Sequence, residues 1–187
     1  MKKFVLVLGP QGSGKSTQAK QLAEFLGYES ISTGDLSRAK LAEGDELGIK
    51  FNSYVIAGKL VPDELIEQIL FPYLEKDIPG VILDGYPRNL NQLANFLNFI
   101  KANDHELSKV FLLEVKEKEF MKRLKLRAEI EKRSDETDDA IKARLDTYNN
   151  LTKPLLAEYE KLKKLQRIDG ERSIEDIQTD LRSYFRS

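Results

Sequence analysis

The sequence predicts an α/β fold in which an open, parallel β-sheet is covered by helices on both faces. Short apolar runs alternate along the chain with segments whose apolar residues recur at helical spacing, the pattern of successive strand–helix units. The runs that we expect to form strands cover residues 4–8, 28–32, 81–84, 109–115 and 165–169. A chain of 187 residues is long enough to form one domain with a buried core.

The first apolar run leads directly into a glycine-rich turn. Residues 9–16 read GPQGSGKS, which fits the pattern G-x-x-x-x-G-K-[ST] without a mismatch. A helical pattern follows, with one face formed by Ala19, Leu22, Ala23 and Leu26. In such a turn the backbone N–H groups converge on a polyphosphate, and the helix N-terminus adds partial positive charge. We therefore expect Lys15 to reach the β- and γ-phosphates of a nucleotide and Ser16 to lie near Mg²⁺.

Three further segments show helical periodicity. Between the third and fourth runs, one face is formed by Leu90, Leu93, Ala94, Leu97 and Ile100. After residue 137, a longer stripe is formed by Ile141, Leu145, Tyr148, Thr152, Leu155, Tyr159 and Leu162. Pro154 falls within that stripe, and we expect it to kink or divide the helix. The last helix follows Ser173, a suitable N-cap, and its stripe is Ile174, Ile177, Leu181 and Tyr184.

Two segments interrupt the alternation. Residues 34–59 have a helical pattern with few apolar positions and are interrupted by Gly44, Gly48 and Gly58, and residues 116–139 are dense in charge. On its own, a charged stretch of this kind indicates a solvated helical face.

Composition excludes several classes of protein. The formal net charge is −1 although 33% of residues are charged, so no basic field indicates a nucleic-acid or membrane partner. The absence of cysteine excludes disulfides, thiolate zinc sites and cysteine nucleophiles. No apolar run approaches the roughly 20 residues of a membrane span, and the first run stops at Gly9, as a buried strand would. We therefore expect a cytoplasmic protein.

The run at residues 81–84 ends in Asp84, a carboxylate placed to hold Mg²⁺ directly or through water. Gly85 follows it, where an ATPase that activates water usually has a glutamate, and no Asn-Lys-x-Asp motif for guanine is present. We interpret His105, in a polar stretch, as a surface residue rather than a base. Phosphoryl transfer needs mainly positioning and positive charge. An acceptor that is itself a phosphate is already anionic, so these residues favour a phosphate acceptor.

Five stretches together resemble the adenylate kinases in their order and spacing. They are residues 9–18, the STGDLSR of 32–38, the GKLVPD of 58–63, the DGYPRNLNQ of 84–92, and a final stretch that contains Arg123, Arg127, Arg133 and Arg144. The resemblance covers essentially the whole chain. Members of that family interconvert MgATP plus AMP with two ADP. Some positions depart from the family pattern: Ser16 replaces a common glycine, and Tyr86 stands where phenylalanine is usual.

The resemblance implies the P-loop nucleoside monophosphate kinase fold, with a five-stranded parallel sheet, a small helical lobe for the monophosphate and a short lid. It implies one kinase domain over 1–187, with a core at 1–32, 61–126 and 135–187, the lobe at 33–60 and the lid at 127–134. The lid has no room for the hairpin of longer variants, so no structural zinc is expected. The family also implies a monomer and ATP, AMP and ADP as ligands, with Mg²⁺ bound together with ATP.

The resemblance also implies roles for individual residues. Those for ATP are Gly12, Ser13, Gly14, Lys15, Ser16, Thr17, Arg123, Arg127 and Gly170. Those for AMP are Thr33, Gly34, Arg38, Lys59, Leu60, Val61, Gly85, Arg88, Gln92, Arg133 and Arg144. The catalytic set is Lys15, Arg88, Arg123, Arg127, Arg133 and Arg144. Ser16 and Asp84 are the candidates for Mg²⁺, through water, and Asp35 is a lesser one.

Other functions stay open at this point. Uridylate–cytidylate kinases resemble the chain closely and favour asparagine at position 89, as here, whereas Thr33 and Gln92 favour AMP. A P-loop ATPase that acts on a partner protein and a non-catalytic nucleotide-binding module are alternatives of other classes, and the full set of arginines disfavours both. The donor base leaves little trace in side chains, so ATP and GTP both remain open as donors.

Overall fold

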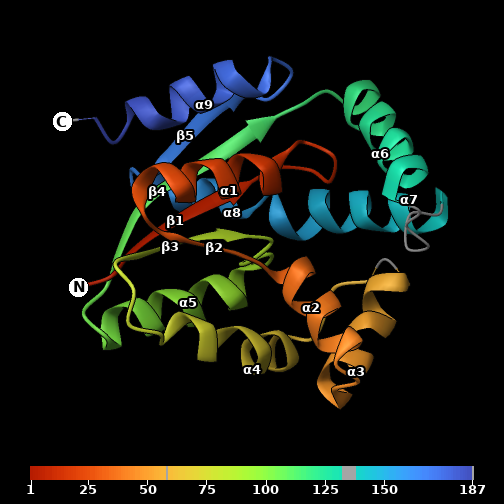
Figure 1. The fold of residues 1–187 in the computed structure, drawn as a ribbon, viewed down its shortest axis with the longest axis horizontal. Coiled ribbons are helices and arrows are strands. Elements are labelled where there is room, and N and C mark those ends of the chain that lie inside the picture. Colours follow the sequence, from red (N-terminus) through yellow and green to blue (C-terminus); the bar gives the residue numbers. More distant parts are fainter. Residues whose placement is uncertain (58, 132–137, 187) are drawn as a thin grey trace.

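The computed structural model describes residues 1–57, 59–131 and 138–186, with side chains except at 125, 127–131, 138, 140 and 144. In this part of the chain a single parallel sheet has the strand order β2-β3-β1-β4-β5 (Figure 1). Its strands are β1 Lys3–Leu8, β2 Glu29–Ser32, β3 Gly80–Asp84, β4 Glu106–Glu114 and β5 Leu165–Asp169. The five-stranded parallel sheet flanked by helices confirms the predicted fold class.

Helices connect the strands. Their bounds are α1 Lys15–Leu26, α2 Thr33–Ala42, α3 Glu46–Ile56, α4 Asp63–Leu74, α5 Leu90–Ala102, α6 Glu117–Glu131, α7 Asp138–Thr147, α8 Leu155–Lys161 and α9 Ile174–Ser183. A π-helical turn, Tyr148–Thr152 (η1), separates α7 from α8. Within the described ranges, no helix combines the length and apolar composition that a membrane span requires.

The side chains of β1 alternate between two cores. Phe4 and Leu6 belong to the core under α4, α5 and α8, whereas Val5 and Val7 face α1 and α9. Figure 1 shows α1 and α9 on one side of the sheet and α4 and α5 on the other. All four of these side chains are fully buried. Burial on both faces explains why the first run is continuously apolar instead of alternating.

The strand order creates a crevice at the carboxyl edge of the sheet. β1 pairs with β3 on one side and with β4 on the other, and Val7 lies opposite Asp84 in the β1–β3 register. The chain leaves β1 and β3 toward opposite flanks, so their ends diverge there. Ligands of open α/β sheets bind at such a switch point. The glycine-rich turn and Asp84 therefore meet at the edge of the sheet that is open to a ligand.

Several elements differ from their predicted bounds. β4 begins at Glu106, three residues before the expected run, because Glu106 and Leu107 already pair with Lys3 and Phe4 of β1. α4 is missing from the expected elements, although Leu65, Ile66, Ile69 and Leu70 are buried at helical spacing.

Three predictions about helices can be compared with the structure. In α5 the expected face was partly wrong, because Leu90 and Ala94 are exposed. The buried side of α5 consists of Gln92, Leu93, Phe96 and Ile100. The break near Pro154 is confirmed, since the helix divides at η1 and Pro154 precedes α8. The N-cap Ser173 is also confirmed.

α2 and α3 form a pair at one side of the molecule (Figure 1). They lie close together because Gly48 of α3 faces the backbone of α2, where an added Cβ would lie 2.5 Å from the carbonyl carbon of Lys40. These helices fall within residues 33–60, the predicted lobe. Of the predicted lid at 127–134, residues 127–131 continue α6, and the remainder lies outside the described residues.

Candidate functional site

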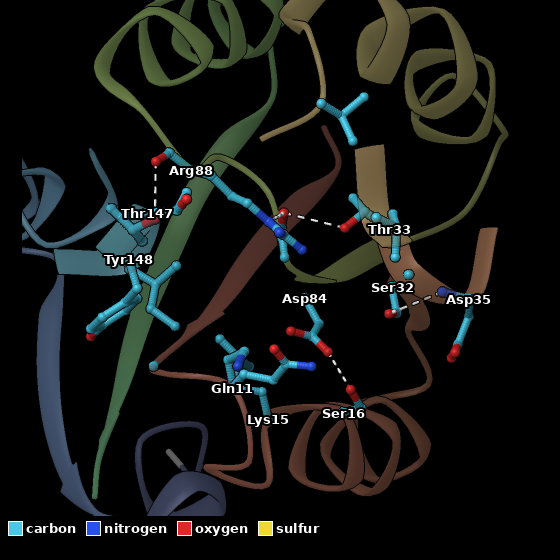
Figure 2. A pocket seen from close by; sticks show the side chains of 18 of the residues that line it. Gln11, Lys15, Ser16, Ser32, Thr33, Asp35, Asp84, Arg88, Thr147 and Tyr148 are labelled. Carbon is cyan, nitrogen blue, oxygen red and sulfur yellow. Dashed lines mark hydrogen bonds between the residues drawn. The ribbon is translucent and has the colours of Figure 1, made fainter. Parts of the chain in front are cut away.

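A cavity of about 530 Å³ opens at the carboxyl ends of β1, β2 and β3. Its volume falls within the range typical of small-molecule sites. The glycine-rich loop and the start of α1 form one wall, and residues after β2 and β3 form the opposite wall. Figure 2 shows Lys15 and Ser16 on the first side, Arg88 and Thr33 on the second, and Asp84 between them.

The glycine-rich loop has a backbone that requires glycine. Gly14, which precedes α1, has a φ of 88°, and Gly12 has a φ of 80°. Both values lie in the left-handed region that glycine adopts without steric cost. A Cβ at Gly12 would also lie 2.8 Å from the carbonyl oxygen of Phe120. The Nζ of Lys15 donates to the carbonyl of Pro10 at 2.8 Å, so the ammonium lies over its own loop at the start of α1.

The residues present fit a magnesium ion bound with a nucleotide. The hydroxyl of Ser16 donates to Oδ2 of Asp84, so a hydroxyl and a carboxylate face each other inside the cavity (Figure 2). Oxygen ligands of this kind, often through water, are what Mg²⁺ prefers. Asp84 is the last residue of β3 and is only 5% exposed, so its carboxylate is largely shielded from solvent. Asp35, the lesser candidate, lies on α2 and is paired with cationic side chains instead.

On the opposite wall, the carbonyl of Gly85 organises two predicted site residues. It accepts hydrogen bonds from the Nε of Arg88 at 2.7 Å and from the hydroxyl of Thr33 at 3.2 Å. Gly85 has a φ of 87°, and a Cβ there would lie 2.5 Å from the Thr33 hydroxyl. The glycine therefore allows β2 and β3 to bring these side chains together at the cavity wall.

Charged side chains join α1 to α2 beside the cavity. Asp35 accepts a hydrogen bond from Arg38 and lies 3.2 Å from the Nζ of Lys20. Burial by itself would raise the pKa of Asp35, but the hydrogen bonds from Arg38 and Lys20 outweigh it and lower the pKa. The two cations are thus held at the cavity by a carboxylate that remains ionised near neutral pH. Lys20 is a cavity residue that the sequence analysis did not predict.

Gln92 lies at the far end of the same wall and is completely buried. Its Oε1 accepts from the backbone N–H of Arg88 at 2.7 Å, and its Nε2 donates to Oδ1 of Asp63 at 2.8 Å. Both ends of the amide are therefore held by the protein. Asp63, on the first turn of α4, was not among the predicted site residues because its partners are distant in sequence.

Arg123 extends from α6 to the edge of the cavity. Its Nε donates to Glu119 at 2.8 Å, and its Nη1 donates to the carbonyl of Gly170 at 2.8 Å. Glu119 lies one turn earlier on α6, so this ion pair orients the guanidinium from within the helix. Arg123 thereby connects the loop after β5 with the cavity.

Most predicted site residues are brought together by the fold. Among the described side chains, the predicted residues that line the cavity are Gly12, Gly14, Lys15, Ser16, Thr17, Thr33, Gly34, Asp35, Arg38, Lys59, Leu60, Val61, Asp84, Gly85, Arg88, Gln92 and Arg123. Ser13 and Gly170 do not line it: Ser13 is buried within the loop, and Gly170 contacts Arg123. Arg133 and the side chains of Arg127 and Arg144 lie outside the described residues.

His105, expected at the surface, is in fact half-buried. Its ring lies 5.8 Å from that of Phe4 and 6.0 Å from that of Phe99, centroid to centroid. It does not line the cavity described above. The correction leaves the interpretation of the site unchanged, because no imidazole enters it from this position.

Comparisons with known proteins agree with this geometry. A family model described as adenylate kinase matches residues 7–164. The adenylate kinase of Prochlorococcus marinus (strain MIT 9301) is 37% identical over 182 residues, which cover 97% of this chain and 98% of the relative. That of Thermus thermophilus is 37% identical over 96% of this chain and 95% of its own length. The adenylate kinase of Thermobifida fusca (strain YX) is 40% identical over 92% of this chain and 93% of its own length.

Proposed function

The chain belongs to the adenylate kinase family, and on that premise we propose that it transfers a phosphoryl group reversibly between MgATP and AMP, which yields two ADP. One observation carries the proposal. A single cavity is lined on one side by the phosphate-binding loop and on the other by Thr33, Arg38 and Arg88. Two facing sets of phosphate-binding groups suit two nucleotides whose phosphates meet between them.

The proposed chemistry depends on charge and positioning. Two facing nucleotides bring several negative charges together, and repulsion would destroy the in-line geometry without compensation. Lys15 would hold the donor phosphates, Arg38 and Arg88 would hold the acceptor phosphate, and Arg123 would neutralise the donor side. Guanidinium groups suit this task because they are permanently charged and bind phosphate oxygens bidentately. The acceptor phosphate is already anionic, so no side chain has to remove a proton.

Ser16 and Asp84 would hold the magnesium ion that accompanies ATP. When bound, the ion supplies positive charge to the phosphate oxygens. The protein's own part is to keep the hydroxyl and the carboxylate facing each other at the ends of α1 and β3. Arg127, Arg133 and Arg144, from the predicted lid and α7, are proposed to complete the positive charge around the transferred group.

We propose that residues 33–60 form the lobe over AMP and residues 127–134 the lid over ATP. Closure of these parts would exclude water, which otherwise competes for the γ-phosphate. The pairing of α2 with α3, which is set to one side of the sheet in Figure 1, supports a separate lobe. We expect the enzyme to act as a cytoplasmic monomer, and size-exclusion chromatography would test its oligomeric state.

The test is to incubate the purified protein with MgADP alone. We expect ATP and AMP to appear in equal amounts as ADP disappears, measured by ion-exchange chromatography of the nucleotides, and EDTA to stop the reaction. Unchanged ADP after long incubation would contradict the proposal. Release of inorganic phosphate from MgATP without any monophosphate would instead favour the ATPase alternative. Turnover of CMP or UMP above that of AMP would favour the pyrimidine monophosphate kinases.

A further inference from the structure

Asp63 gathers the side-chain amides of three residues at the start of α5. Its Oδ1 accepts from the Nδ2 of Asn89 at 2.9 Å and from the Nε2 of Gln92 at 2.8 Å, and its Oδ2 accepts from the Nδ2 of Asn91 at 2.6 Å. We propose that Asp63 is a positioning residue that holds the Gln92 amide in one orientation and thereby determines which bases the acceptor site admits. This inference rests on the proposed function.

The amide of Gln92 can be turned over, which exchanges its oxygen and its NH₂ group with little change of shape. Its two hydrogen-bond partners are compatible with only one of these orientations. A carboxylate only accepts hydrogen bonds, so the NH₂ group must face Asp63. The backbone N–H of Arg88 only donates, so the carbonyl oxygen must face Arg88. Turning the amide over would set oxygen against oxygen and donor against donor.

Burial makes the wrong orientation costly. Gln92 has no exposed surface, so in the wrong orientation its amide groups would lack hydrogen-bond partners that water could otherwise supply. Asp63 remains ionised near neutral pH: burial raises its pKa, but the hydrogen bonds from Asn91, Asn89 and Gln92 together outweigh burial and lower it. A charged acceptor holds an amide donor more strongly than a neutral one does.

The fixed amide still has one N–H and one oxygen lone pair to offer, because each end has used one of its two positions. Gln92 borders the cavity but is fully buried in this structure, so these groups serve only a base that enters the cavity beside it. Adenine offers an amino donor beside a ring-nitrogen acceptor, a pair that a glutamine amide binds bidentately. Hypoxanthine has the same size, but a carbonyl replaces the amino group. A fixed amide should therefore prefer AMP to IMP, whereas an amide that can turn over would accept both.

The experiment compares kcat/KM for AMP and for IMP, with saturating MgATP, in the wild type and in Asp63→Ala. Water that enters beside alanine can donate or accept, so it does not impose one orientation. We expect the AMP/IMP ratio to fall about tenfold, the size of one hydrogen bond to a charged group. The KM for MgATP should stay within about twofold. A purely structural role for Asp63 would lower both rates together and leave the ratio unchanged.

Glu67→Gln is the matched control. Glu67 lies one turn further along α4 and accepts from the Nδ2 of Asn95 at 2.9 Å and from the hydroxyl of Tyr86 at 3.1 Å. We expect its AMP/IMP ratio to equal that of the wild type. If Asp63→Ala does not fold, Asp63→Ser replaces it, because a hydroxyl also donates or accepts and should lower the ratio in the same way.

The inference and the proposed function fail in different ways. If the wild type does not phosphorylate AMP, the proposed function is wrong. If the wild type is active but the AMP/IMP ratio of the Asp63 variant stays within about twofold, Asp63 does not fix the amide. An equal fall in Glu67→Gln would also overturn the inference, because the effect would then belong to α4 in general.

Discussion

Arg88 is fixed in place by three different parts of the fold. Its Nε donates to Gly85, its backbone N–H donates to Gln92, and its carbonyl accepts from the hydroxyl of Thr152 at 3.0 Å. The loop after β3, the first turn of α5 and the π-helical turn thus all hold this one residue. If Arg88 binds the acceptor phosphate as proposed, a charge held in this way would not have to reorganise during the transfer, and that would be the source of its catalytic value.

We expect Arg88→Ala to lower kcat at least about 100-fold, because a preorganised charge at the transfer centre is lost. The measurement is the rate of ATP formation from MgADP. Arg172→Ala is the control, since that exposed arginine pairs with Asp180 away from the cavity. Turnover of Arg88→Ala close to the wild type would mean that Arg88 does not contact the reacting phosphates.

Asp63 also makes stability depend on pH. Its pKa in the folded protein is lowered, so the stability that it contributes is fully present above its unfolded-state pKa of about 4. That stability is lost as the pH falls through the lower pKa of the folded state. We expect the difference in unfolding free energy between the wild type and Asp63→Ala to shrink from about pH 6 to about pH 3, as measured by urea denaturation. A difference that does not change with pH would show that Asp63 is not ionised in the fold.

At the level of single residues, the sequence was informative wherever a side chain belongs to a local motif. Lys15, Ser16 and Asp84 were all predicted, and the structure places them in one cavity. Asp63 was not predicted as a site residue, because its partner Gln92 is 29 residues away and no short sequence motif contains both. A carboxylate at the start of α4 has an ordinary explanation, namely the favourable charge at a helix N-terminus.

At the level of elements, α9 shows how a local signal sets a boundary. Its apolar stripe and the N-cap Ser173 were both predicted, and the hydroxyl of Ser173 accepts from the backbone N–H of Asp176 at 3.1 Å. Ile177 and Leu181 pack against the core shared with α1. Ile174 and Tyr184 of the predicted stripe are exposed, so only half of the stripe is buried. The cap and the two buried positions lie within one helix, and a short stretch of sequence therefore contained that part of the signal.

Ser173→Ala should lower the free energy of unfolding by about 1 kcal/mol, because a backbone N–H in the first turn loses its partner. Urea denaturation at neutral pH measures the change. Ser183→Ala is the control at the other end of α9, where the hydroxyl donates to the carbonyl of Asp180 and caps no N–H. We expect that change to stay within about 0.5 kcal/mol. Equal effects of the two substitutions would contradict the capping role.

The bounds of β4 and the burial of Gln92 in α5 depended on contacts with neighbouring elements. The first residues of β4, Glu106, Leu107 and Ser108, do not form a continuous apolar run. Glu106 nevertheless joins the ladder, because its N–H donates to the carbonyl of Lys2 at 2.9 Å. In α5 the fold buries Gln92 and exposes Leu90, contrary to the apolar stripe. The buried side still contains Leu93, Phe96 and Ile100, so hydropathy sets most of the orientation of this helix. Gln92 joins that side because both ends of its amide are paired with other parts of the protein.

At the level of the whole molecule, two cores hold the sheet between its helical layers. The larger core includes Leu70 of α4 and Phe96 of α5, and the ring of Phe96 lies 5.4 Å from that of Phe4 in an edge-to-face arrangement. The same α4 and α5 hold Asp63 and Gln92 at their N-terminal ends. Packing of this layer therefore also positions the cavity wall that we propose binds the acceptor.

Leu70→Ala should lower the free energy of unfolding by about 2–5 kcal/mol, since Leu70 is 0% exposed and its removal leaves a cavity in the larger core. The control is Leu162→Ala, at a position that is 43% exposed, for which we expect less than about 1 kcal/mol. Both are measured by urea denaturation monitored by circular dichroism. A small effect at Leu70 would mean that α4 is not packed as described.

The sequence by itself determined the phosphate-binding loop, the order of the strands and of the helices other than α4, and the carboxylate that ends β3. These features depend on residues within a few positions of one another, and spacing alone encodes them. The tertiary structure decided which strands are neighbours. The order β2-β3-β1-β4-β5 brings Thr33, Asp84 and Arg88 to the loop that contains Lys15. It likewise brought Asp63 to Gln92, because contacts between side chains distant in the chain depend on how whole elements pack.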